Sequence, residues 1–211
     1  MNYLAHLLLA GPEPEALLGA LMGDFVKGPL GEQYAPAITH ALALHRKVDS
    51  FTDAHSVTAA SRARVSPQRR RFAGIMVDLF YDHFLARDWA AHASEPLSAF
   101  TRRVYALLDQ HEALLPERLR LIAPRMAEYD WLGSYAYVES IHAALDRMSH
   151  RLTRTNTLAG AGAELEANYA ALEADFRAFF PDVVRFAQTQ RAPASSVLGY
   201  DARADRDPPG P

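Results

Sequence analysis

The most informative stretch of this sequence is FAGIMVDLFYDHFL, residues 72–85. Its side chains are apolar nearly all round a helix, which is typical of a helix buried in the centre of a protein. Besides Tyr81, its ionisable groups are Asp78, Asp82 and His83. Asp78 and Asp82 are four residues apart and share a helix face, where two carboxylates repel each other unless a cation or a proton lies between them. The stretch therefore predicts a central helix and a candidate metal site, with an Asp–Arg pair and one hydrogen-bonded histidine as the alternative.

The chain around this stretch is also helical in character. Alanine and leucine far outnumber valine, isoleucine and threonine, a balance that favours helix over strand. Helical signals cover residues 2–10, 14–26, 36–51, 57–64, 68–87, 96–115, 116–129, 137–152 and 163–188. We predict an all-α fold, a single-domain helical bundle of about eight helices in residues 1–190. The polar, proline-rich residues 191–211 are expected to form a disordered tail.

The amino-acid composition limits the metal ligands and the partners that this protein can have. Cysteine is absent, so any metal must be held by histidine and carboxylate side chains. With 22 Lys+Arg against 25 Asp+Glu, the surface as a whole is not a nucleic-acid footprint, and no nucleic acid is expected as partner. The apolar start, residues 1–10, lacks a basic flank and fits neither a signal peptide nor a membrane span. We expect a cytoplasmic protein with no membrane partner.

Further polar residues interrupt apolar helical segments. His45, Asp49 and Asp53 are spaced by four residues, while His6 and Asp24 stand alone among apolar neighbours. Each has a simple alternative role: Asp53 can cap the next helix, His45 and Asp49 can form a solvated pair, and His6 can be a hydrogen-bonded core residue. Together, however, four helices deliver histidine or aspartate from apolar faces, as helical bundles do when they build metal sites.

The ligand set predicted on this basis is Asp24, His45, Asp49, Asp78, Asp82 and His6, with His6 and His83 in direct contact with the ion or just behind it. Such donors suit Mn²⁺, with Mg²⁺ or Fe²⁺ as alternatives, better than a closed structural zinc centre. The signatures of P-loop enzymes, dinucleotide oxidoreductases, zincins and α/β-hydrolases do not occur. Phosphoester hydrolysis is the natural use of such a site.

Four ordered motifs carry a family resemblance. They are Asn2-Tyr-Leu-Ala-His6, Gly23-Asp24-Phe-Val-Lys27-Gly28, His45-Arg46-Lys-Val-Asp49 followed by Thr52-Asp53, and Asp78-x-x-x-Asp82-His83-Phe84. With the MAEYDWL segment at 126–132, they resemble the acyl carrier protein phosphodiesterases from residue 1 to about 190. That family is similar to the HD-domain metal phosphohydrolases, which implies an HD-domain-like fold. The order Asp82-His83 is the reverse of the His-Asp dyad of an HD domain, so ligands cannot be transferred by simple superposition.

The resemblance implies a function. The family hydrolyses the phosphodiester that joins 4′-phosphopantetheine to a serine of holo acyl carrier protein, which makes acyl carrier protein the expected partner and substrate. In such a reaction, His83 would protonate the leaving serine oxygen, and Arg46 and Lys27 would hold the non-bridging oxygens. The alternatives are an HD-like phosphohydrolase of a small nucleotide and a non-enzymatic helical binding protein whose buried polar groups only specify packing.

An arginine run offers a docking surface for an acidic protein. Five arginines fall within residues 62–71, which contain no acidic residue: Arg62, Arg64, Arg69, Arg70 and Arg71. Acyl carrier proteins, the partner implied by the resemblance, are strongly acidic, and such complementarity speeds encounter and sets orientation. The alternative is a solvated run whose arginines pair with nearby acids.

Overall fold

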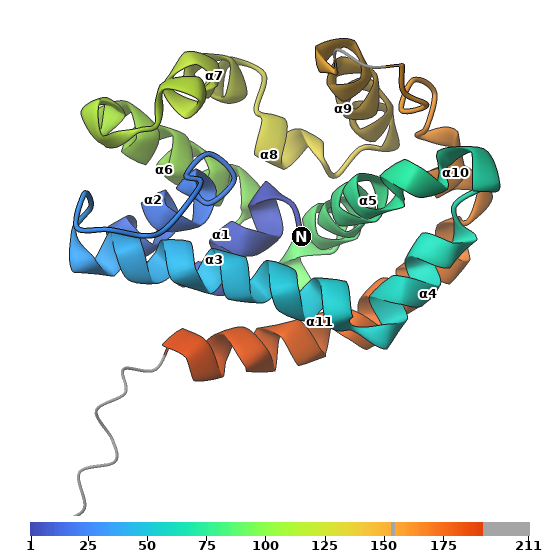
Figure 1. The fold of residues 1–211 in the computed structure, drawn as a ribbon, viewed down its shortest axis with the longest axis horizontal. Helices are drawn as coiled ribbons and strands as arrows, with labels where there is room; N and C mark the ends of the chain where they lie inside the picture. The colour runs from blue at the N-terminus through green and yellow to red at the C-terminus, as the bar shows by residue number, and fades with distance from the viewer. Residues whose placement is uncertain (153–154, 192–211) are drawn as a thin grey trace, which may run out of the picture.

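The computed structural model describes residues 1–152 and 155–191, and these residues form helices and no strands (Figure 1). The α-helices are α1 (Tyr3–Ala10), α2 (Pro14–Met22), α3 (Pro36–Ala54), α4 (Ser56–Arg64), α5 (Ala73–Arg87), α6 (Leu97–Gln110), α7 (Glu117–Glu128), α8 (Trp131–Ser134), α9 (Val138–Arg151), α10 (Ala163–Ala167) and α11 (Tyr169–Arg191). Three short 3₁₀-helices are η1 (Pro67–Phe72), η2 (Trp89–Ala91) and η3 (Glu112–Leu114). The all-α prediction is confirmed, with eleven α-helices in the described residues in place of about eight. Of the tail predicted at 191–211, only Arg191 lies within the described residues.

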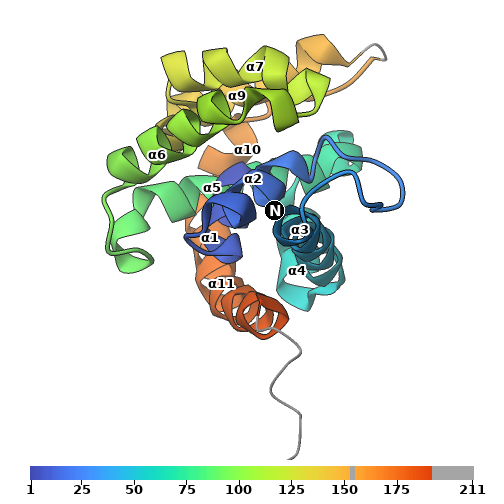
Figure 2. The ribbon, with the colours of Figure 1, turned by 90° about the vertical axis from the view of Figure 1, so that its left-hand side faces the viewer.

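The helices are arranged in three levels. Helices α6, α7 and α9 lie together on one side, α3, α4 and α11 on the other, and α1, α2 and α5 between them (Figure 2). The centre of α5 is buried as predicted: Phe80, Tyr81 and Phe84 have no exposed surface. Tyr81 and Phe84 pack against Phe176 of α11, which fixes the lower level to the middle one.

Two predicted helices end or begin differently from the expectation. The segment expected at 68–87 is divided, because Pro67 starts a 3₁₀-helix and the backbone of Phe72 (φ −106°, ψ 6°) leaves the α-helical region before α5 begins. The segment expected at 14–26 ends as α2 at Met22, and Asp24 lies in the turn that follows. Asp24 is therefore carried by a turn at the end of a helix.

Helices α2 and α3 approach each other closely at two glycines. A Cβ atom added to Gly19 would lie 2.6 Å from Cβ of Ala41, and one added to Gly23 would lie 2.2 Å from Cγ of His45. The close approach sets the imidazole of His45 against the end of α2. None of the helices in the described residues combines the length with the apolar character that a membrane crossing requires.

Candidate metal centre

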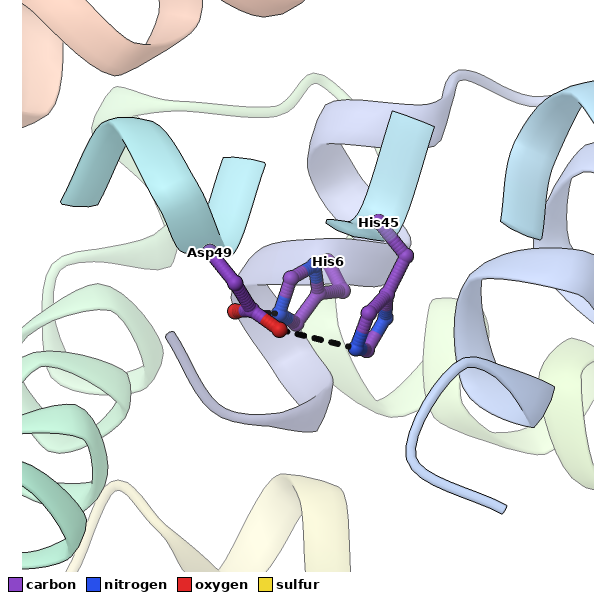
Figure 3. Close-up of side chains that lie close together, drawn as sticks. All are labelled: His6, His45 and Asp49. Carbon is purple, nitrogen blue, oxygen red and sulfur yellow. Dashed lines mark hydrogen bonds and ion pairs between the residues drawn. The ribbon is translucent and has the colours of Figure 1, made fainter. Parts of the chain in front are cut away.

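Three of the predicted ligands converge from two helices. His6 comes from α1, while His45 and Asp49 stand one turn apart on α3 (Figure 3). Asp49 Oδ1 lies 3.0 Å from His6 Nε2, and Asp49 Oδ2 lies 3.3 Å from His45 Nε2. One ligand atom from each residue lies within 4.8 Å of the other two, and this is the one such group of three or more among the described residues. Both histidines are buried, whereas Asp49 is partly exposed.

The hydrogen bond of His45 to the backbone fixes its tautomer. Nδ1 of His45 lies 2.8 Å from the carbonyl oxygen of Ala20, which can only accept, so Nδ1 carries a proton and donates it. Nε2 then lies 3.3 Å from Asp49 Oδ2 and 3.8 Å from Asp24 Oδ1. Two carboxylates beside this nitrogen are stabilised by either a proton on Nε2 or a cation between them. Metal-binding histidines commonly donate their other N–H to a backbone carbonyl in this way.

His6 remains neutral over the physiological pH range. Burial and the neighbouring His45 lower its pKa from 6.5 to about 3, and the two rings stack with centroids 3.6 Å apart. Its Nε2 lies 3.2 Å from the carbonyl oxygen of Met1 and 3.0 Å from Asp49 Oδ1, and because both oxygens accept, Nε2 carries the proton of the neutral ring, which a cation bound at this atom would displace. Neutral imidazole is the form that binds metal ions.

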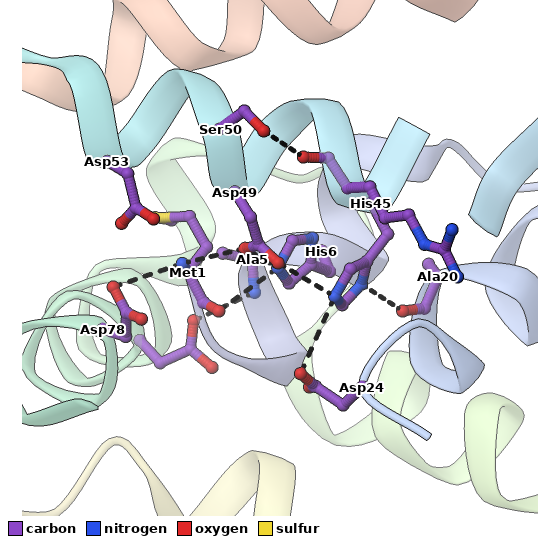
Figure 4. Close-up of polar contacts among 12 residues, drawn as sticks. Met1, Ala5, His6, Ala20, Asp24, His45, Asp49, Ser50, Asp53 and Asp78 are labelled. Carbon is purple, nitrogen blue, oxygen red and sulfur yellow. Dashed lines mark hydrogen bonds and ion pairs between the residues drawn. The ribbon is translucent and has the colours of Figure 1, made fainter. Parts of the chain in front are cut away.

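The carboxylates around the histidines differ in their electrostatics (Figure 4). Burial alone would raise the pKa of Asp49, but hydrogen bonds from His45 and His6 hold it well below its usual range. Burial raises the pKa of Asp24 and of Asp78. Asp78 Oδ1 forms an ion pair with the amino group of Met1 at 3.2 Å but has no hydrogen-bond partner within the described structure. The cluster thus contains an ionised carboxylate, with two that ionise less readily beside it.

Asp24 and Asp78, which stand beside the cluster, line a cleft of about 280 Å³. The cleft runs between the middle level and the α7–α9 side, and its lining residues are Met1, Asn2, Tyr3, Asp24, Phe25, Ile75, Asp78, Arg118, Ile122, Met148 and Arg151. Its two arginines, Arg118 and Arg151, are functional candidates that the sequence patterns do not single out. Arg151 lies at the end of the predicted helix 137–152, one turn after Arg147, and this basic pair was the available signal.

Asp82 and His83 are not brought to the three-residue cluster. The two oxygens of Asp82 accept hydrogen bonds from the backbone N–H groups of Leu4 (2.8 Å) and Ala5 (3.0 Å), so this carboxylate holds the first turn of α1. His83 faces the other way round α5, with Nδ1 2.8 Å from the carbonyl oxygen of Tyr135 and Nε2 2.8 Å from the hydroxyl of Tyr169. Their predicted roles as ligand and leaving-group acid have no supporting contact in this geometry.

The other predicted functional side chains lie around the site or away from it. Arg46 donates to the carbonyl oxygen of Val26 at 3.0 Å and so ties the loop after α2 to α3. Lys27 is exposed in that loop and acts electrostatically on Asp24, whose pKa its charge lowers. Asp53 forms an ion pair with Arg62, and the side chain that caps α4 belongs to His55.

Most of the predicted docking arginines make internal contacts. Arg62 pairs with Asp53, Arg64 with Asp175, and Arg69 with Glu164. Arg70 donates to the carbonyl oxygens of Val65 and Ala63. Arg71 is exposed, and in the described part of the chain its side chain contacts only the ring of the adjacent Phe72. The role of this run in binding a partner stays a prediction.

The fold and the cluster define a class: all-helical proteins that bring histidine and aspartate from separate helices to a partly open cleft. Comparison with known proteins identifies the family. The sequence profile described as "Acyl carrier protein phosphodiesterase" matches residues 1–183. Proteins of that name are 38% identical in Serratia proteamaculans and 35% identical in Pectobacterium atrosepticum, each over 90% of this chain and all of the relative. One from Photorhabdus laumondii is 33% identical over 90% of this chain and 96% of its own.

The chain therefore belongs to the acyl carrier protein phosphodiesterase family, as the sequence motifs indicated. No solved structure matches it. The likeness to HD-domain hydrolases accordingly stays a prediction.

Proposed function

We propose that this protein is a metal-dependent phosphodiesterase that releases 4′-phosphopantetheine from the serine of holo acyl carrier protein. The family consists of phosphodiester hydrolases, and the chain is a hydrolase of that kind. The relatives that this chain matches over their whole length are named as phosphodiesterases of acyl carrier protein. The observation that supports the metal dependence is the convergence of His6, His45 and Asp49, whose ligand atoms all lie within 4.8 Å of one another.

The residues present fit a divalent cation. His6, His45 and Asp49 would hold it, with Asp78, which lines the adjoining cleft, completing the set. Two imidazoles with carboxylates favour Mn²⁺ or Fe²⁺ over Mg²⁺, which prefers all-oxygen surroundings. When bound, the cation supplies Lewis acidity that polarises the phosphoryl oxygens and acidifies a water molecule.

The remaining side chains of the cleft have complementary tasks. Arg118 and Arg151 line it and are exposed, with no carboxylate partner in the described structure, so they can hold the non-bridging oxygens of the phosphodiester. Asp24 stands at the cluster with a pKa raised by burial, which suits it to accept the proton of the attacking water. In this proposal Arg118 and Arg151 take the oxygen-binding role that the family resemblance suggested for Arg46 and Lys27.

A mass measurement on the carrier tests the activity. Purified protein is incubated with holo acyl carrier protein and Mn²⁺, and the carrier is weighed by intact-mass spectrometry. We expect conversion to the apo form, no conversion with excess chelator, and none with Asp49→Asn. The matched control is Asp53→Asn, one turn further along α3 and paired with Arg62, which should convert the carrier like the wild type. A carrier that stays holo with the wild type and Mn²⁺ would refute the proposed function.

A further inference from the structure

A second pocket adjoins the candidate active site on the α7–α9 side. It has a volume of about 580 Å³ and is lined by Arg125, Glu128, Tyr129, Trp131, Ser134, Ser140, Ala143, Arg147 and Arg151. Arg151 also lines the cleft beside Asp24 and Asp78. A partner seated in the second pocket would therefore present its substituent to the cleft.

This surface is positively charged, and its arginines are not paired with acidic side chains in the described structure. Arg125, Arg147 and Arg151 line the pocket against a single acid, Glu128. All three arginines are exposed, as is Arg118, and within the described ranges 1–152 and 155–191 none of these four forms an ion pair. Unpaired cations gathered on one face attract a partner of opposite charge.

Aromatic and apolar side chains accompany the arginines. Tyr129 and Tyr137 are 64% and 65% exposed, and Leu121 of α7 is 71% exposed. The guanidinium groups of Arg147 and Arg151 lie 5.5 Å and 5.8 Å from the ring centroid of Trp131, which keeps both side chains over the pocket. Exposed aromatic residues with arginine are the composition that distinguishes protein interfaces from the remaining surface.

We propose that this surface, made of Arg118, Arg125, Arg147 and Arg151 with Tyr129 and Trp131, docks the acidic carrier protein. The inference rests on the proposed function, because that function supplies a protein substrate. The arginine run at 62–71 is less suited to this task, since Arg62, Arg64 and Arg69 are already paired with Asp53, Asp175 and Glu164. Docking on α7–α9 also places the partner directly at the mouth of the cleft.

The test reverses two charges that lie outside the cleft. In Arg125→Glu/Arg147→Glu, the altered residues line only the second pocket, so the metal ligands and Arg118 and Arg151 are untouched. Binding is measured with apo acyl carrier protein, which carries no phosphodiester. We expect the Kd to rise about tenfold or more and its salt dependence to flatten. The kcat/KM for holo carrier should fall similarly, with hydrolysis of bis(p-nitrophenyl) phosphate unchanged.

The control is Arg71→Glu/Arg102→Glu, which makes the same change of charge at two exposed arginines with no ion pair in the described structure. It should bind apo carrier like the wild type. An equal loss in this control, or unchanged affinity in Arg125→Glu/Arg147→Glu, would overturn the docking surface. Failure of the proposed function would appear differently, as wild-type protein that leaves holo carrier unhydrolysed in the presence of Mn²⁺.

Discussion

Asp82 illustrates how one carboxylate can serve the fold rather than the chemistry. It is fully buried, and its two oxygens accept the backbone N–H groups of Leu4 and Ala5. In Asp82→Asn, the amide nitrogen would face one of these N–H groups, leaving a buried donor unpaired. We expect the free energy of unfolding, measured with urea, to fall by about 1–3 kcal/mol.

The matched variant for this prediction is Asp24→Asn. The side chain of Asp24 is 43% exposed and, within the described residues, accepts no backbone hydrogen bond. Its stability in the metal-free state should stay within about 0.5 kcal/mol of the wild type. Equal urea midpoints for Asp82→Asn and the wild type would show that Asp82 does not hold α1.

His6 gives the protein a defined pH dependence. Burial and His45 lower its pKa from 6.5 to about 3 in the folded state. As the pH falls below 6.5, the unfolded chain binds a proton there and the folded protein does not, so stability is lost between pH 6.5 and about 3. In chelator, the wild type should lose more unfolding free energy between pH 7.5 and about 4.5 than His6→Gln, which cannot titrate. Parallel curves would contradict the buried, neutral state of His6.

At the scale of elements, the crossing of α2 and α3 positions the site. Gly23 is in contact with His45, and a Cβ at this position would meet the imidazole at 2.2 Å to 2.5 Å. Gly23→Ala must therefore displace His45, and we expect Mn²⁺ affinity to fall at least tenfold, with a loss of about 1–3 kcal/mol in stability. Gly31→Ala is the matched control, since nothing lies within 4 Å of its added Cβ. Unaltered Mn²⁺ binding in Gly23→Ala would separate His45 from the metal site.

Helical spacing explains what the sequence could predict within one element and where it failed. His45 and Asp49 are four residues apart, so their convergence on one face of α3 follows from helix geometry. The same spacing joins Asp78 and Asp82 on α5, but their carboxylates have different partners. Asp82 accepts a backbone hydrogen bond from Leu4 in the first turn of α1, whereas Asp78 lines the cleft. Spacing gives the face of a helix, whereas the partner across that face depends on packing.

At the scale of the whole molecule, the helical class and the family were predictable, because they rest on composition, periodicity and ordered motifs. The position of His6 beside α3 was not, since it depends on how α1 packs between α3 and α5 (Figure 1). The sequence likewise could not show that the arginines of α7 and α9 are left without ion pairs in the described structure. The sequence shows where cations are dense, at 62–71, but only the fold shows which of them are already paired.

We propose that His6, His45 and Asp49 bind the metal ion on which hydrolysis depends. The most direct test of this proposal is titration of the metal-free protein with Mn²⁺, following the electron paramagnetic resonance signal of free Mn²⁺. We expect the wild type and Asp53→Asn to bind Mn²⁺ with the same affinity, and Asp49→Asn to bind it at least tenfold more weakly, because the carboxylate charge beside the two imidazoles is lost. Equal Mn²⁺ affinity in Asp49→Asn and the wild type would contradict the proposal.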